Sequence, residues 1–126
     1  MKKAIIIFAL ISLLFSCTED EIDPSAVNIR LANTSNFDYK NIVINTTTGN
    51  VDFGDLNSGK FSEYKAFEMA YRYAYVELEI NGNTLKLQPF DYVGETPLEN
   101  GKYTYEIYTE SADEENGALS IKLIND

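Results

Sequence analysis

Residues 71–90 read YRYAYVELEINGNTLKLQPF, and this stretch decides the fold class. Apolar and polar side chains alternate on both sides of the dipeptide Asn81-Gly82. That dipeptide is a preferred centre for a two-residue type I′ turn, in which both central residues take positive φ angles. The stretch therefore predicts an antiparallel β-hairpin with its tip at Asn81-Gly82.

The position of the turn also fixes the pairing register of this hairpin. It places Leu78 opposite Leu85 and Glu77 opposite Lys86, so that apolar meets apolar and acid meets base. A slip of one residue would turn every side chain to the other face, so this agreement supports the register. The predicted core-facing residues of the first strand are Ala74, Val76, Leu78 and Ile80.

Short alternating runs separated by Gly, Asn, Ser and Asp continue over residues 26–126. The clearest are residues 26–33, 39–45, 101–110 and 118–126, the last two predicting a second hairpin. We also expect a strand at residues 60–64, and a helical turn or linker at 65–70. The pattern predicts an all-β domain, a small antiparallel β-sandwich of about seven to eight strands.

Two short pieces carry a resemblance to known domains. LNSGKF at residues 56–61 and LENGKY at residues 98–103 resemble the turn-to-strand pattern of immunoglobulin-like and transthyretin-like bacterial domains. In that pattern a glycine takes a positive-φ turn position and the aromatic residue enters the sheet. The resemblance implies the sandwich architecture alone.

The composition excludes several classes of function. The 126 residues carry a net charge of −10 and contain no histidine and one cysteine, Cys17. The negative charge argues against nucleic acid as a partner, because phosphates require Lys and Arg. Without histidine the chain lacks the usual general base and the commonest zinc ligand. We therefore expect a non-enzymatic domain without metal or cofactor.

The first residues have the pattern of an export signal. Lys2 and Lys3 precede an uncharged apolar run over residues 4–15. This run is shorter than the roughly 20 residues needed to cross a bilayer as a helix. It has the length of the apolar region of a secretory signal peptide.

The end of this run, LFSC, places Leu14, Ser16 and Cys17 at positions −3, −1 and +1 of a cleavage site. It resembles the lipobox of bacterial lipoproteins. The resemblance implies that the Cys17 thiol receives a diacylglycerol, that cleavage occurs just before it, and that the lipid holds the protein on a membrane. Residues 1–16 would be the signal peptide, 17–25 the acylated cysteine with an acidic linker, and 26–126 the β-sandwich.

The acidic cluster after the cysteine carries a second resemblance. TEDE, with Glu19, Asp20 and Glu21, is similar to the export signal of surface lipoproteins of Bacteroidota. This resemblance implies an outer-membrane lipoprotein that faces the cell exterior. The alternative is a solvated acidic linker.

The candidate ligand-binding residues are aromatic. Tyr71, Tyr73 and Tyr75 alternate with the core-facing residues of the first hairpin, and Phe90 is expected opposite Tyr73. If they line an outer face, their rings suit a sugar ring or a protein partner. The alternative is that another segment of the chain covers them.

A cation site is the weaker alternative for the turn DFGDLNSG. Asp52, Asp55 and Asn57 offer oxygens of the kind that Ca²⁺ prefers. The spacing does not match an EF-hand loop, because Gly59 and Ala66 occupy two of the ligand positions. We interpret the segment as a turn.

Two functions are compatible with these observations. The first is a lipid-anchored surface domain that contacts a protein or a glycan. The second is a periplasm-facing structural or inhibitory lipoprotein of the cell envelope.

Overall fold

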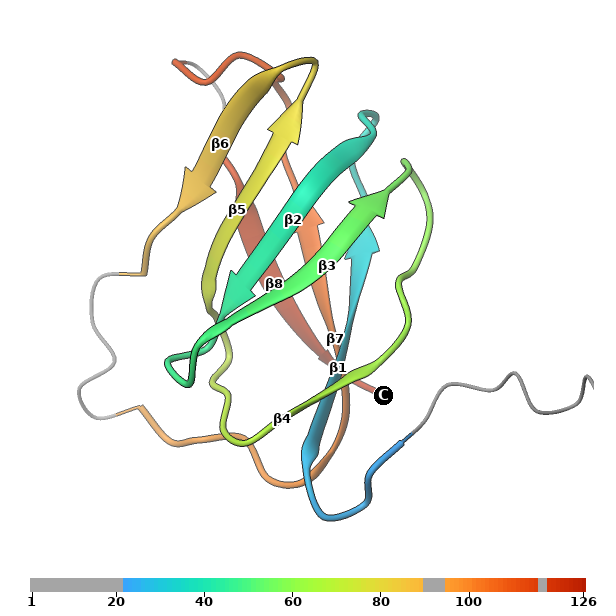
Figure 1. Ribbon diagram of the computed structural model, residues 1–126, viewed down its shortest axis with the longest axis vertical. Helices are drawn as coiled ribbons and strands as arrows, with labels where there is room; N and C mark the ends of the chain where they lie inside the picture. The colour runs from blue at the N-terminus through green and yellow to red at the C-terminus, as the bar shows by residue number, and fades with distance from the viewer. Residues whose placement is uncertain (1–21, 90–94, 116–117) are drawn as a thin grey trace, which may run out of the picture.

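A computed structural model of the chain describes residues 22–89, 95–115 and 118–126. These residues form eight strands: β1 (Val27–Asn33), β2 (Tyr39–Asn45), β3 (Asn50–Leu56), β4 (Lys65–Phe67), β5 (Tyr75–Ile80), β6 (Asn83–Leu87), β7 (Gly101–Tyr108) and β8 (Ser120–Asn125). The first sheet has the order β4-β1-β7-β8 and the second the order β3-β2-β5-β6. Figure 1 shows the second sheet in front of the first. The predicted all-β sandwich is confirmed, and no part of the described chain forms a helix able to span a membrane.

The hairpin that decided the fold class has the predicted register. Leu78 pairs with Leu85 and Glu77 with Lys86 across β5 and β6. Asn81 and Gly82 form the tip, with φ angles of 53° and 86°. Alternation and turn chemistry together were therefore sufficient to place this hairpin.

The tip of this hairpin gives a test of backbone strain. We expect Gly82→Val to lower the free energy of unfolding by more than about 1 kcal/mol, because a β-branched residue is disfavoured at positive φ. A Cβ at this position would meet no atom within 4 Å, so a steric clash is not the cause. The control is Gly82→Asn, since asparagine tolerates positive φ. Equal losses in urea denaturation would contradict this explanation.

The second predicted hairpin is also confirmed. Tyr105 pairs with Leu123 and Ile107 with Ile121 across β7 and β8. These side chains face the second sheet and contribute to the core.

Two local predictions were wrong. Residues 60–64 form no strand, only an isolated bridge between Phe61 and Ala32. The segment expected to be a helical turn or linker contains β4, which pairs antiparallel with the start of β1. Phe67 at the end of β4 is buried in the core. Its burial explains the strand, and three residues are too few to show alternation in the sequence.

The pairing of β1 with β7 differs from the prediction that all strands pair antiparallel. These strands run parallel, from Val27 beside Gly101 to Asn33 beside Ile107. The first sheet is therefore mixed. A parallel pair needs a long crossover connection, and here the whole second sheet lies between the two strands in the chain.

One hydrophobic core lies between the sheets. The predicted residues Ala74, Val76, Leu78 and Ile80 are all buried, with at most 1% of their surface exposed. From the first sheet the core contains Ile29, Leu31, Tyr105 and Ile107. The core thus includes inward-facing residues of both sheets.

A buried amide also connects the two sheets. Asn33, at the end of β1, donates from Nδ2 to the carbonyl oxygens of Phe37 (2.7 Å) and Leu56 (2.9 Å). Its Oδ1 accepts from the backbone N–H (2.9 Å) and hydroxyl (2.7 Å) of Ser35. Because Leu56 ends β3, this side chain ties the first sheet to the second.

We expect Asn33→Ala to lower the free energy of unfolding by about 2–3 kcal/mol. The change removes four hydrogen bonds at a site that is only 1% exposed, and a buried polar group left without a partner costs about 1–3 kcal/mol. Asn36→Ala is the matched control, since Asn36 is exposed. Losses of the same size at both positions in urea denaturation would show that the buried amide does not connect the sheets.

Candidate functional site

The candidate tyrosines lie at and before the start of β5. Tyr75 is the first residue of this strand, and Tyr71 and Tyr73 precede it. All three are half-buried. Phe90, Cys17 and the acidic residues 19–21 lie outside the described residues.

Hydrogen bonds from other parts of the chain fix the segment that leads to Tyr75. Thr46 donates from its hydroxyl to the carbonyl oxygen of Met69 (2.7 Å). The Leu98 N–H donates to Ala70 (2.8 Å), and the Tyr105 hydroxyl donates to Tyr71 (2.7 Å). The backbone before β5 therefore has a fixed place at the side of the sandwich.

Tyr73 lines an apolar groove between the edge strands of the two sheets. The groove holds about 420 Å³. Its other lining residues come from the end of β6 and the start of β8: Leu87, Gln88, Pro89, Leu119, Ser120 and Ile121.

Tyr75 lines a different depression, on the outer face of the second sheet. This depression holds about 430 Å³ and is lined by Asn45, Thr47, Asn50, Tyr75 and Gln88. We call it the amide depression. Asn45 ends β2, Asn50 begins β3, and Gln88 follows β6, so four chain segments meet here.

Hydrogen bonds order the amide depression. The Asn45 Nδ2 group donates to Asn50 Oδ1 (3.0 Å), and the Thr47 N–H donates to Asn45 Oδ1 (2.7 Å). The Tyr75 hydroxyl donates to Glu77 Oε1 (2.7 Å), and this bond raises the pKa of Tyr75. The tyrosine ring thus extends along its strand towards Glu77.

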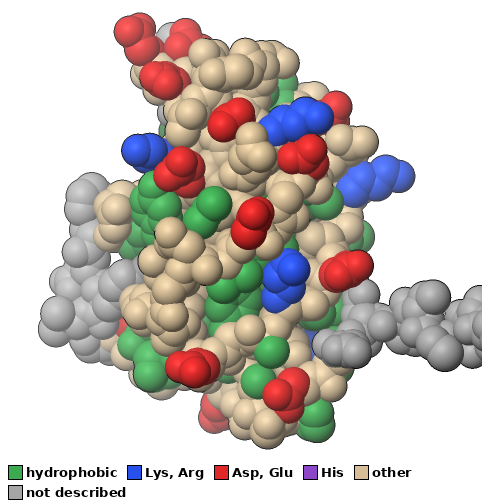
Figure 2. All heavy atoms as spheres, in the orientation of Figure 1, with side chains coloured by type: hydrophobic (Ala, Val, Ile, Leu, Met, Phe, Trp, Pro, Cys, Tyr) green, Lys and Arg blue, Asp and Glu red, His purple; other side chains and the backbone are tan. Residues whose placement is uncertain are grey.

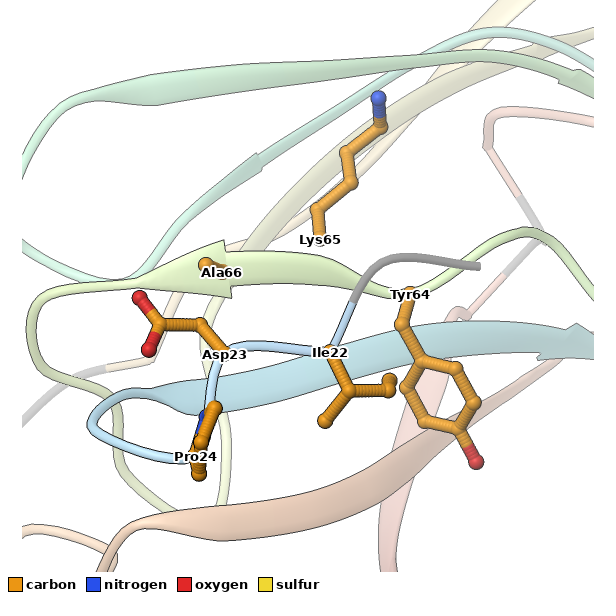
Figure 3. A pocket seen from close by; sticks show the side chains of 6 residues that line it. All are labelled: Ile22, Asp23, Pro24, Tyr64, Lys65 and Ala66. Carbon is orange, nitrogen blue, oxygen red and sulfur yellow. The ribbon is translucent and has the colours of Figure 1, made fainter. Parts of the chain in front are cut away.

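A further hollow, of about 720 Å³, lies where the chain enters the domain. It is lined by Ile22, Asp23, Pro24, Tyr64, Lys65 and Ala66. Figure 3 shows that the side chains of Lys65 and Tyr64 point to opposite sides of the strand, with the Asp23 carboxylate pointing away from both. The polar groups of the described lining residues thus point in different directions.

The turn considered for a cation is held by its own carboxylates. Asp52 accepts a hydrogen bond from the Gly54 N–H (2.9 Å), and Asp55 accepts one from the Asn41 N–H (3.0 Å). Lys40 also lies 3.7 Å from Asp55. Within the described ranges, no group of three or more His, Cys, Asp or Glu could hold a metal ion.

Sequence reasoning missed a cationic and aromatic cluster on the outer face of the first sheet. The Arg30 guanidinium lies 4.0 Å from the ring centre of Phe61 and 5.1 Å from that of Tyr64. Arg30 also donates to the Thr104 hydroxyl (3.0 Å) and lies 3.8 Å from Asp126. Arg30 is the one residue of β1 that is not buried, but only the tertiary structure brings the rings over it. The contacts of the Arg30 guanidinium with these two rings hold residues 61–64 against β1.

Three pKa shifts bear on acid–base chemistry. Hydrogen bonds from Ser25 lower the pKa of Asp23, and burial raises the pKa of Tyr39 to about 12. The pKa of Tyr75 is also raised. At neutral pH these shifts keep the carboxylate ionised and both phenols protonated, so none of the three groups gains the properties of a general base.

The fold defines the class of the chain, a two-sheet all-β sandwich domain. No protein-family model matches the chain, and no curated protein matches it in sequence. Among solved structures, an NMR structure of a protein from Eubacterium rectale is similar, with a TM-score of 0.52 and 20% identity. The match covers 77% of this chain and 88% of that one. At this level of identity the similarity concerns the fold alone.

Proposed function

We propose that the chain is a lipid-anchored lipoprotein of the bacterial outer membrane, with a non-enzymatic surface domain that contacts a protein or a glycan. The observation that carries this proposal is the position of the single cysteine. Cys17 follows a basic start and an apolar run, and it precedes the acidic cluster and the folded domain. A lipid on this thiol is the membrane partner of the protein.

Hydrogen bonds hold the first residues of the folded domain in place, which supports a membrane anchor a short distance before them. Asn28, which is fully buried, accepts from the Asp23 N–H (3.0 Å) and donates to the Asp23 carbonyl oxygen (2.7 Å). It also donates to Ala26 (3.1 Å) and Gly101 (3.2 Å). The chain is therefore held to the first sheet from Asp23 onward.

A short tether would then separate the lipid from the domain. Residues 18–22 lie between Cys17 and the fixed Asp23, and a fully extended chain spans at most about 3.3–3.6 Å per residue. The tether reaches roughly 20 Å. One acyl chain gives only marginal membrane binding, whereas two give a stable anchor, so a diacylglycerol would hold the domain close to the membrane.

The outward orientation is tested with the acidic cluster. We expect protease treatment of intact cells to remove the domain from the wild-type protein. Replacing Glu19, Asp20 and Glu21 together by Asn should protect the domain, because the variant lacks the export signal and stays on the inner leaflet. The measurement is the amount of full-length protein in an immunoblot after proteolysis.

The matched control replaces Glu110, Glu114 and Glu115 together by Asn. These exposed residues lie in the loop after β7, and this variant should remain as sensitive to protease as the wild type. If all three proteins are equally sensitive to protease, the acidic cluster is only a linker and not an export signal. Resistance of the wild type itself would favour the periplasm-facing structural or inhibitory lipoprotein.

A further inference from the structure

We propose that the amide depression is a binding site for a neutral glycan, with Tyr75 as the stacking platform. This inference rests on the proposed function and deepens it, because it chooses between a protein and a glycan and assigns the site. It also selects Tyr75 from the three tyrosines that the sequence offered as ligand-binding residues.

The chemistry of the lining residues carries the choice of ligand. Three amides, one hydroxyl and one phenol line the depression, and among the described residues that line it none is charged. A carboxamide offers a donor and an acceptor side by side, which matches two neighbouring sugar hydroxyls. An anionic ligand would find no cation there, and a largely apolar ligand would find a single ring.

Two polar groups in the depression are available to a ligand. The Asn50 Nδ2 group and the Gln88 Oε1 atom form no hydrogen bond with any residue that the structure describes. Asn50 Oδ1 is already held by Asn45, which fixes the direction of the Asn50 amide. The amide thus has one half anchored and the other half free to bind.

The aromatic platform is ordered in advance. Tyr75 pairs with Asn45 across β2 and β5, which sets the ring beside the amides. Its hydroxyl is engaged by Glu77, so a ligand would use the face of the ring rather than the hydroxyl. Aromatic faces suit sugar rings because the apolar C–H surface of a sugar packs on the ring.

The surroundings of the depression fit an extended, uncharged ligand. Figure 2 shows the outer face of the second sheet, where neutral polar side chains and backbone cover much of the surface between scattered charges. The apolar groove at Tyr73 lies next to the depression and shares Gln88 with it. A chain of several sugar units could therefore follow the surface past Gln88.

The test is isothermal titration of the full-length protein, purified in detergent, with maltohexaose, cellohexaose and mannohexaose. Hexagalacturonate is the anionic comparison. We expect at least one neutral hexasaccharide to bind and the anionic one not to bind. Absence of binding by all three neutral probes at millimolar concentration, or preference for the anionic probe, would overturn the proposal.

Variants then locate the site. Tyr75→Leu should weaken binding at least about 10-fold, and Asn50→Ala and Gln88→Ala each about 3- to 10-fold, as expected for a lost hydrogen bond. Tyr75→Phe keeps the ring and should bind within about 3-fold of the wild type. If Tyr75→Phe binds as weakly as Tyr75→Leu, the ring is not the platform.

The matched controls are Tyr108→Leu and Asn36→Ala. Both residues are exposed and lie outside the depression, and binding should be unchanged. Unfolding curves of every variant confirm that the domain is folded. If the protein binds the glycan normally but resists protease on intact cells, the surface location is wrong and the binding site stands. If the protein is acylated and sensitive to protease but binds no glycan, the binding site is wrong and the lipid-anchored surface role stands.

Discussion

Cys17→Ser is expected to leave the protein without lipid and with its signal peptide attached. In the lipoproteins that this segment resembles, the thiol receives the diacylglycerol and cleavage follows at the modified cysteine. A serine hydroxyl is a far weaker nucleophile than a thiol near neutral pH. Labelling of cells with a radioactive fatty acid should mark the wild-type protein and give no signal for the variant, which should also migrate as the longer precursor.

Ser16→Ala is the matched control for this change. It keeps a small residue before the cleavage site and leaves Cys17 in place. We expect normal labelling and normal processing of this variant. Fatty-acid labelling of Cys17→Ser at the wild-type level would refute the lipoprotein assignment and, with it, the membrane partner.

Much of the fold was predictable because the determining interactions are local. The hairpin of β5 and β6 combines alternation with a turn dipeptide that sets the register, and both strands are adjacent in the chain. The hairpin of β7 and β8 was predicted from the alternation in residues 101–110 and 118–126, without a turn dipeptide to set its register. Local patterns of this kind depend only on residues a few positions apart.

The features that sequence reasoning missed depend on distant residues. The parallel pairing of β1 with β7 joins residues about 74 positions apart, such as Ile29 and Tyr103. The strand β4 exists because Phe67 reaches the core beside the start of β1. Neither feature leaves a periodic pattern in a single sequence.

The candidate site also depends on contacts between distant residues, which the sequence did not reveal. Alternation predicted the tyrosine row, but the structure places Tyr73 and Tyr75 in two different depressions. The amides beside Tyr75 come from the end of β2, the start of β3 and the residue after β6. Sequence reasoning did not select Asn45 or Asn50, because their approach to Tyr75 depends on the pairing of β2 with β5.

Leu78→Ala is expected to lower the free energy of unfolding by about 2–5 kcal/mol. Leu78 is fully buried and lies opposite Leu85, which is 3% exposed, in the centre of the second sheet. The smaller side chain removes apolar contacts and leaves a cavity that the two sheets cannot close. Urea denaturation should show the loss as a lower midpoint with an unchanged slope.

The control for Leu78→Ala is Leu87→Ala, the same chemical change in the same hairpin. Leu87 is only half-buried at the edge of the second sheet, so water can occupy the space of the lost methyl groups. We expect Leu87→Ala to lower the free energy of unfolding clearly less than Leu78→Ala.

Tyr73→Ala should also lower the free energy of unfolding less than Leu78→Ala, because the Tyr73 ring lines the apolar groove. If all three variants lost the same stability, the edge between β6 and β8 would be as tightly packed as the core. The apolar groove at Tyr73 and Leu87 would then not be an open surface for a ligand.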